Sequence, residues 1–229
     1  MAFAREAAKS LESRLCVACV DMLDVTGAGI TIMGGEQAGP VCVSNSRMAA
    51  LEDLQFTIGV GPCRDAFKSG QPVHAPRLDN TASTRWPSFV DLARATAIGA
   101  VFAYPMSSKA AKIGVLTLYQ NYEGELSEAQ HSDSLAVAEI LAETILSLQA
   151  AAPAGTLAAG LQDAVAYRAE IYQASGMVSI QLRIPAADAL LRIRGYAFTH
   201  DRPVGSVAAD IVARRLRLTD DSPEREAGG

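Results

Sequence analysis

Hydrophobic and polar residues follow one pattern in the front of the chain and another in its rear. In the front, apolar residues three or four positions apart predict a helix over 3–23. The polar residues 107–112 are typical of a hairpin turn. Runs rich in β-branched residues predict strands at 26–33, 39–45, 72–78, 98–106 and 112–120, with short helical pieces at 65–70 and 88–97. This pattern predicts an α+β domain, a mostly antiparallel sheet with helices on one side.

A long helix is predicted after the last strand, and a domain boundary follows it. Ser127 begins this helix, and SEAQ forms a capping box. Apolar residues at steps of three or four give the helix an apolar face: Leu135, Ala138, Leu141, Ile145 and Leu148. A proline and a glycine in AAPAG, residues 151–155, end the helix. We therefore predict one domain over 1–150 and a second over 156–219.

The rear of the chain has helical patterning only. Apolar residues predict a long helix over 157–178, a second helix from Pro185 and a third from Asp201. Three helices form a small core, so we expect a partner, with the seam along 157–171 pairing two chains as a short coiled coil. The acidic tail, 220–229, is expected to be disordered.

Gly176 lies in the middle of the first of these helices. A glycine inside a helix costs about 0.5–1 kcal/mol relative to alanine, so it usually marks a close approach to the backbone. Two explanations are open: another molecule approaches the helix at Gly176, or two helices of the bundle cross closely there.

Charge is distributed unevenly along this chain, whose net charge is −5. Residues 1–150 carry 11 basic and 16 acidic side chains, and residues 220–229 carry one arginine and four acids. Residues 151–219 carry eight arginines, no lysine and five acids. Because arginine is preferred for contacts with phosphates and base edges, this distribution suggests two modules with different roles.

The start of the chain and its cysteines are expected to be those of a cytoplasmic protein. No apolar run near the start is long enough for a signal peptide, and no 18 uncharged apolar residues occur together. The four cysteines are therefore expected as reduced thiols: Cys16, Cys19, Cys42 and Cys63. Neither a second CxxC nor paired histidines accompany the first two, so we expect no metal site.

The rear segment resembles the ANTAR domain, a three-helix RNA-binding module of transcription antitermination regulators. The resemblance rests on QASGMVSIQLRIPAADALLRIRGYAFTHDRPVGSVAADIV and on its spacing of Ala174, Gly176, Ala189, Ile193, Arg194, Ala197, Val204, Val207 and Ala208. It implies a homodimer that binds paired RNA stem-loops and stabilises them, so that an overlapping terminator or translation-blocking hairpin does not form.

The same resemblance implies which residues contact RNA. Ala174 and Gly176 would be a small surface that RNA approaches, and Arg194 a charged contact. The other implied contacts are stacking on Tyr196 and Phe198 and a backbone contact from Arg202. The sequence departs from the family pattern at Ser175, where a lysine is common, and also at Ser179 and Pro203.

The front domain resembles GAF domains, which bind small molecules or dimerise. The resemblance rests on FTIGVGPCRDAFKSGQPVHAPRL, RWPSFVDLARATAIGAVFAYPM and KIGVLTLYQNYEGELSEAQ. It implies a ligand pocket at Cys63, Trp86 and Phe89, with no cofactor that the sequence names. Cys63 is either a redox-sensing thiol or a small buried residue, and the two aromatic residues either line a ligand site or close the core.

The order GAF then ANTAR is similar to an actinobacterial type of regulator. We therefore expect a protein that is not an enzyme: an RNA-binding regulator whose front domain senses a small-molecule or redox signal, without a membrane partner. Two alternatives stay open. One is a thiol enzyme built on the front domain, and the other is a protein-interaction module that has lost RNA binding.

Overall fold

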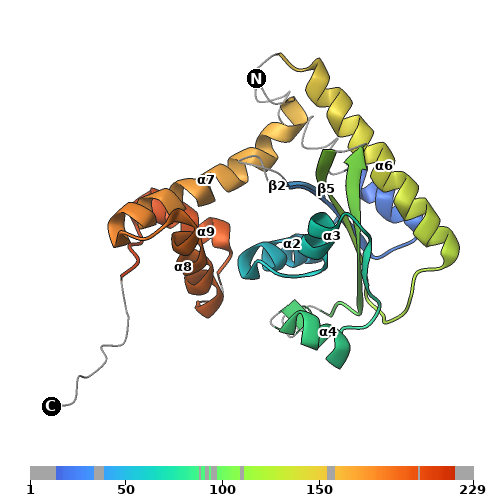
Figure 1. The fold of residues 1–229 in the computed structure, drawn as a ribbon, viewed down its shortest axis with the longest axis horizontal. Coiled ribbons are helices and arrows are strands. Elements are labelled where there is room, and N and C mark those ends of the chain that lie inside the picture. The colour runs from blue at the N-terminus through green and yellow to red at the C-terminus, as the bar shows by residue number, and fades with distance from the viewer. Residues whose placement is uncertain are drawn as a thin grey trace. The chain divides into compact units, whose positions relative to one another are not determined.

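The computed structural model describes residues 14–33, 39–87, 89–90, 93, 97–108, 111–153, 158–200 and 202–219 (Figure 1). The chain divides into two compact units, residues 1–168 and 169–229. The predicted boundary at 151–155 stays a prediction. Parts of four other predictions lie outside the described residues, namely the helix over 3–13, most of the helical piece at 88–97, the turn at 109–110 and the acidic tail.

The first unit is built on a five-stranded antiparallel sheet, as the sequence predicts. Its strands are β1 (Gly27–Ile32), β2 (Gly39–Val43), β3 (Val73–Ala75), β4 (Ala100–Ser108) and β5 (Ala111–Gln120). Their order across the sheet is β2-β1-β5-β4-β3, and every neighbouring pair is antiparallel. The long strands β4 and β5 lie in the interior of the sheet, and most of their residues are buried.

Helices cover both faces of this sheet, so the expectation of helices on one side is wrong. Figure 1 shows α2 (Ser46–Ile58) and α3 (Pro62–Ser69) on one face and α6 (Glu128–Ala151) on the other. The physical reason lies in β4, where successive side chains point to opposite faces. Val101 and Ala103 pack with α2, α3 and α4 (Asn80–Arg85), while Phe102 and Tyr104 pack with α6. Both faces are therefore apolar and need a cover.

The capping box of α6 is confirmed. Ser127 Oγ accepts a hydrogen bond from Gln130 N at 3.2 Å, and Gln130 Oε1 accepts one from Ser127 N at 3.0 Å. The helix buries Val137, Ala138, Leu141, Ala142 and Ile145. Two residues of the predicted apolar face, Leu135 and Leu148, are instead 42% and 51% exposed, since the buried face is narrower than the apolar pattern. By length and composition alone, α6 could also cross a membrane.

The second unit consists of the end of α7 (Ala159–Leu182) with α8 (Ala186–Thr199) and α9 (Val204–Val212), which confirms three helices. Small and branched residues form its core: Ile171, Ala174, Val178, Ala189, Ile193, Ala197, Val204, Val207, Ala208 and Ile211. Alanines at these contacts let the helices approach closely. The side chains of 159–168, which include most of the predicted coiled-coil seam, lie outside the described part of the structure.

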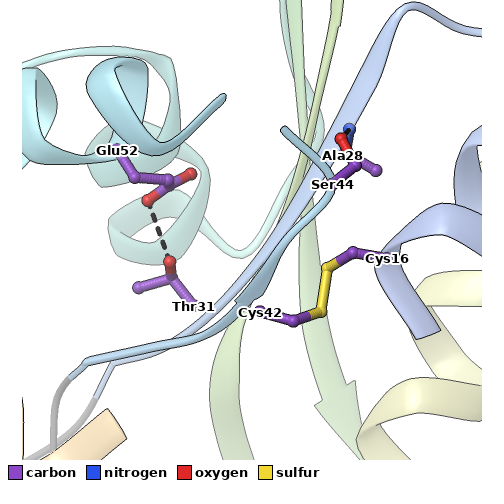
Figure 2. Close-up of a disulfide and its surroundings, with 6 residues drawn as sticks. All are labelled: Cys16, Ala28, Thr31, Cys42, Ser44 and Glu52. Carbon is purple, nitrogen blue, oxygen red and sulfur yellow. Dashed lines mark hydrogen bonds between the residues drawn. A yellow bond between two sulfur atoms is a disulfide. The ribbon is translucent and has the colours of Figure 1, made fainter. Parts of the chain in front are cut away.

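Cys16 and Cys42 form a disulfide, which overturns the expectation that all four cysteines are reduced. Figure 2 shows Cys16 on the helix that covers 14–23 and Cys42 on the edge strand β2. The bond joins residues 26 positions apart, with a Cα–Cα distance of 6.0 Å. Cys19 and Cys63 are free and buried. Because only the packing of the helix on β2 brings the two sulfurs together, CxxC spacing gave no indication of this pairing.

Candidate RNA interface and sensor pocket

The middle of α7 places the two residues of the predicted small surface differently. Ala174 is 0% exposed and belongs to the core of the bundle, so its side chain does not form a surface that RNA contacts. A Cβ added at Gly176 would meet no heavy atom within 4 Å. The explanation by a close helix crossing at Gly176 is therefore wrong, because the space beside this glycine is open.

Ser175 faces the interior of the second unit. Its side chain is 2% exposed, and its Oγ donates a hydrogen bond to the carbonyl oxygen of Ala186 at 2.7 Å, which fixes the start of α8 to α7. A nearby hydroxyl repeats this arrangement, since Ser179 Oγ donates to the carbonyl oxygen of Ile184 at 2.6 Å. Ser175 stands where the ANTAR pattern commonly has a lysine. Its buried side chain stabilises the turn between α7 and α8 and does not face solvent.

Two residues that the sequence did not single out lie one turn before and one turn after Gly176. Tyr172 is 39% exposed and Ile180 is 82% exposed. Residues four apart lie on the same face of a helix, so an aromatic ring, an open backbone and an aliphatic side chain follow one another along the outside of α7. The spacing of four was visible in the sequence, but exposure was not.

The end of α8 carries an aromatic pair. The rings of Tyr196 and His200 stack at 3.8 Å with an angle of 14° between their planes, and His200 Nδ1 lies 2.9 Å from the carbonyl oxygen of Tyr196. The ring of Tyr196 therefore has one face covered by His200. Arg194 is half-buried on the same helix, and the side chain of Phe198 lies outside the described part of the structure.

Arg202 is held by a carboxylate. Its Nη2 lies 2.5 Å from Asp210 Oδ2, and Arg215 Nε lies 2.8 Å from Asp210 Oδ1. Hydrogen bonds from Arg202 and then from Arg215 lower the pKa of Asp210 below its ordinary value. Because this anion bridges the two guanidinium groups, a phosphate contact from Arg202 would have to compete with Asp210.

The residues of the predicted ligand pocket lie in one hydrophobic cluster of the first unit. Cys63 and Phe89 are buried, and Cys63 Sγ lies 3.8 Å from Met33 Sδ. Cys63 N donates to Gln55 Oε1 at 2.8 Å. Trp86 and Phe89 meet edge to face with ring centres 6.2 Å apart. Trp86 borders a hollow of the described structure.

This hollow has a volume of about 380 Å³ and lies between β3 and α4. Its polar border consists of His74, Arg77, Asp79 and Arg85 beside Trp86. Arg85 stacks over the Trp86 ring at 4.5 Å, and Asp65 Oδ2 accepts hydrogen bonds from Trp86 Nε1 at 3.1 Å and from Arg85 Nε at 2.9 Å. The hollow thus combines guanidinium groups with an aromatic residue, which suits a small ligand with an anionic group.

A histidine pair lies near the same strand, on the α6 side of the sheet. The rings of His74 and His131 are 5.1 Å apart, and Tyr104 Oη lies 3.0 Å from His131 Nδ1. Burial and then the charge of His131 lower the pKa of His74, while burial raises the pKa of Tyr104 to about 12. His131 comes from α6, a helix distant from His74 along the chain, so no local pattern indicates this pair. Among the described residues, no group of three or more potential metal ligands occurs.

Several solved structures are similar to part of this chain, at low sequence identity and with TM-scores below 0.5. A domain of a two-component sensor histidine kinase protein from Sinorhizobium meliloti is 15% identical with a TM-score of 0.49, over 62% of this chain and 92% of that chain. The GAF domain region of a membrane protein from Geobacter sulfurreducens is 14% identical with a TM-score of 0.48, over 63% and 97%.

A third similar structure is the GAF domain of an Acinetobacter phosphoenolpyruvate-protein phosphotransferase. It is 12% identical with a TM-score of 0.49, over 64% of this chain and 87% of that chain. No family model and no curated protein matches the chain. These similarities concern the course of the backbone alone.

Proposed function

We propose that this protein is an RNA-binding regulator, in which the C-terminal helices contact RNA stem-loops and the first unit senses a signal. The proposal includes a homodimer, a cytoplasmic location and a binding rather than a catalytic role. It is the function that the ANTAR and GAF resemblances imply. It also accounts for the eight arginines of residues 151–219 in an otherwise acidic protein, because arginine is preferred for contacts with phosphates.

The open backbone at Gly176 carries the proposal. A glycine in a helix interior lowers stability, and here no packing contact requires it, because a Cβ would meet nothing within 4 Å. Tyr172 and Ile180 are exposed on either side of it. A ring for base stacking beside an accessible helix backbone is a surface that an unpaired RNA loop fits.

A gel-shift experiment tests the proposal directly. The full chain is incubated at low salt with candidate leader RNAs that contain two stem-loops, and with duplex DNA of matched length. We expect a shift of RNA that weakens steeply as salt increases, because phosphate contacts release counterions. Absence of a shift with every candidate leader would refute RNA binding and favour a protein-interaction module.

For the sensing role, we propose the hollow beside Trp86 as the signal site. Trp86 is the only tryptophan in the chain, so its fluorescence reports on this hollow without engineered probes. A library of small carboxylates and phosphates can be titrated against that signal. An Arg77→Ala variant should weaken any response, because Arg77 borders the hollow and its side chain is 67% exposed. Saturable responses that Arg77→Ala leaves unchanged would place the ligand elsewhere.

A further inference from the structure

A groove in the second unit lies next to the open face of α7. It has a volume of about 480 Å³ and is formed by the end of α7, the end of α9 and the segment that follows α9. Its border combines aliphatic side chains, an amide and two guanidinium groups: Met177, Ile180, Gln181, Ile211, Arg214 and Arg217. Ile180, one turn after Gly176, belongs to both the groove and the open face.

The groove exists because the chain turns back sharply after α9. Arg214 adopts a left-handed conformation with φ of 59°, Arg214 N donates to the carbonyl oxygen of Ile211 at 3.0 Å, and Arg215 N donates to that of Asp210 at 2.8 Å. This is the hydrogen-bond pattern of a Schellman cap. Gln181 Nε2 donates to the carbonyl oxygen of Leu218, whose side chain is buried. Both ends of the returning segment are therefore fixed.

The residue in the left-handed position is informative. Glycine is the usual residue at this place in a Schellman cap, because a side chain in the left-handed region is strained. Here the position holds an arginine whose side chain borders the groove. Strain that persists at a site is a reason to look for a function of the side chain.

The two arginines of the groove differ from Arg202 and Arg215 in whether a carboxylate forms a salt bridge with them. Arg202 and Arg215 share the carboxylate of Asp210. Arg214 and Arg217 make no salt bridge with any residue that the structure describes. The groove therefore presents positive charge at the edge of an apolar floor.

We propose that this groove binds one unpaired nucleotide of an RNA loop. The base lies on the aliphatic floor, and Arg214 and Arg217 hold the adjoining phosphates. The inference rests on the proposed RNA-binding function and adds a site to it, outside the residues that the family resemblance implies. An RNA loop offers both a base for the apolar floor and phosphates for the two guanidinium groups. The planar guanidinium group suits the geometry of a phosphate.

The test compares two arginine-to-glycine variants of the full chain. Arg214 and Arg183 both have a left-handed backbone at a helix end, with φ of 59° and 55°, and only Arg214 borders the groove. Arg214→Gly and Arg183→Gly thus remove the same charge and relieve the same type of strain, so neither variant is expected to unfold. The probe is a fluorescein-labelled pool of two-hairpin RNAs with randomised loops that contain 4-thiouridine.

We expect Arg214→Gly to weaken binding of this pool about tenfold, because a charge-assisted phosphate contact is lost. The slope of log affinity against log salt should fall by about one, whereas Arg183→Gly should change affinity less than about twofold. Photocrosslinks should map to residues 177–181 or 211–217. Failure of the unaltered protein to bind would overturn both proposals. Equal losses in the two variants, unchanged affinity in Arg214→Gly, or crosslinks elsewhere would overturn the groove alone.

Discussion

Replacing Gly176 with alanine separates the stability of α7 from its proposed function. The added methyl group meets no heavy atom within 4 Å, so it creates no clash. Alanine in a helix interior is favoured over glycine by about 0.5–1 kcal/mol. The variant Gly176→Ala should therefore be more stable by about that amount, and it should bind RNA more weakly because the methyl group keeps RNA away from the backbone.

Stability is measured by urea unfolding of the full chain, followed by circular dichroism at the helix band. Trp86 fluorescence, recorded in parallel, reports the first unit and should not change, since the only tryptophan lies there. Gly195→Ala on α8 is the matched control, because a Cβ at Gly195 also meets nothing within 4 Å. We expect the same gain in stability from this variant and an RNA affinity within about twofold of the original, since no close backbone approach is proposed there.

Two results would refute this reasoning. A loss of stability in Gly176→Ala would mean that the space beside the glycine is occupied in solution. A gain in stability with unchanged RNA affinity would mean that RNA does not approach α7 at this point, and the main support for the proposed function would be lost.

Three further predictions concern single features of the fold. Reduction of the disulfide between Cys16 and Cys42, or a Cys42→Ser variant, should destabilise the first unit by about 3–4 kcal/mol in the chain-entropy model. Urea unfolding followed by Trp86 fluorescence measures this loss, and an unchanged unfolding midpoint would contradict the cross-link. The pKa of His74 is lowered, so the folded state favours its neutral imidazole. The contribution of His74 to stability should be fully present above pH 6.5, its ordinary pKa, and should be lost as the pH falls through the lowered pKa. A His74→Phe variant should lack this dependence in the same assay, and a persistent dependence would assign it to other groups. Ser175→Lys should lower stability by about 1–3 kcal/mol, because it buries an ammonium group and removes the hydrogen bond to α8; a lysine variant of unchanged stability would show that this side chain reaches solvent.

The sequence determined the elements whose signals are local. The five strands follow from β-branched runs bounded by glycine and proline, and all five are present. The capping box at Ser127 marked the start of α6 because its two hydrogen bonds involve residues three apart. The helical periods after 156 likewise predicted α7, α8 and α9. Each signal depends on residues close together in the chain, so no tertiary contact was needed to recognise it.

The helix α2 had no clear local signal. The helix α2 buries Glu52 and Gln55 along with Met48 and Leu51, so its buried face is not uniformly apolar. Thr31 Oγ1 on β1 donates a hydrogen bond to Glu52 Oε2 at 2.8 Å, which Figure 2 shows. A buried carboxylate with a hydrogen-bond partner from another element disguises the amphipathic pattern, and only the packing supplies that partner.

Tertiary structure alone decided which of the predicted site residues are accessible to solvent and which contact one another. The sequence places Ala174, Ser175 and Gly176 together, yet packing within the second unit buries the first two and leaves the third open. The sequence determined that α7 carries a glycine in its interior. Only the packing decided that this glycine faces open space, because burial depends on contacts between helices that are distant along the chain, and periodicity does not specify those contacts.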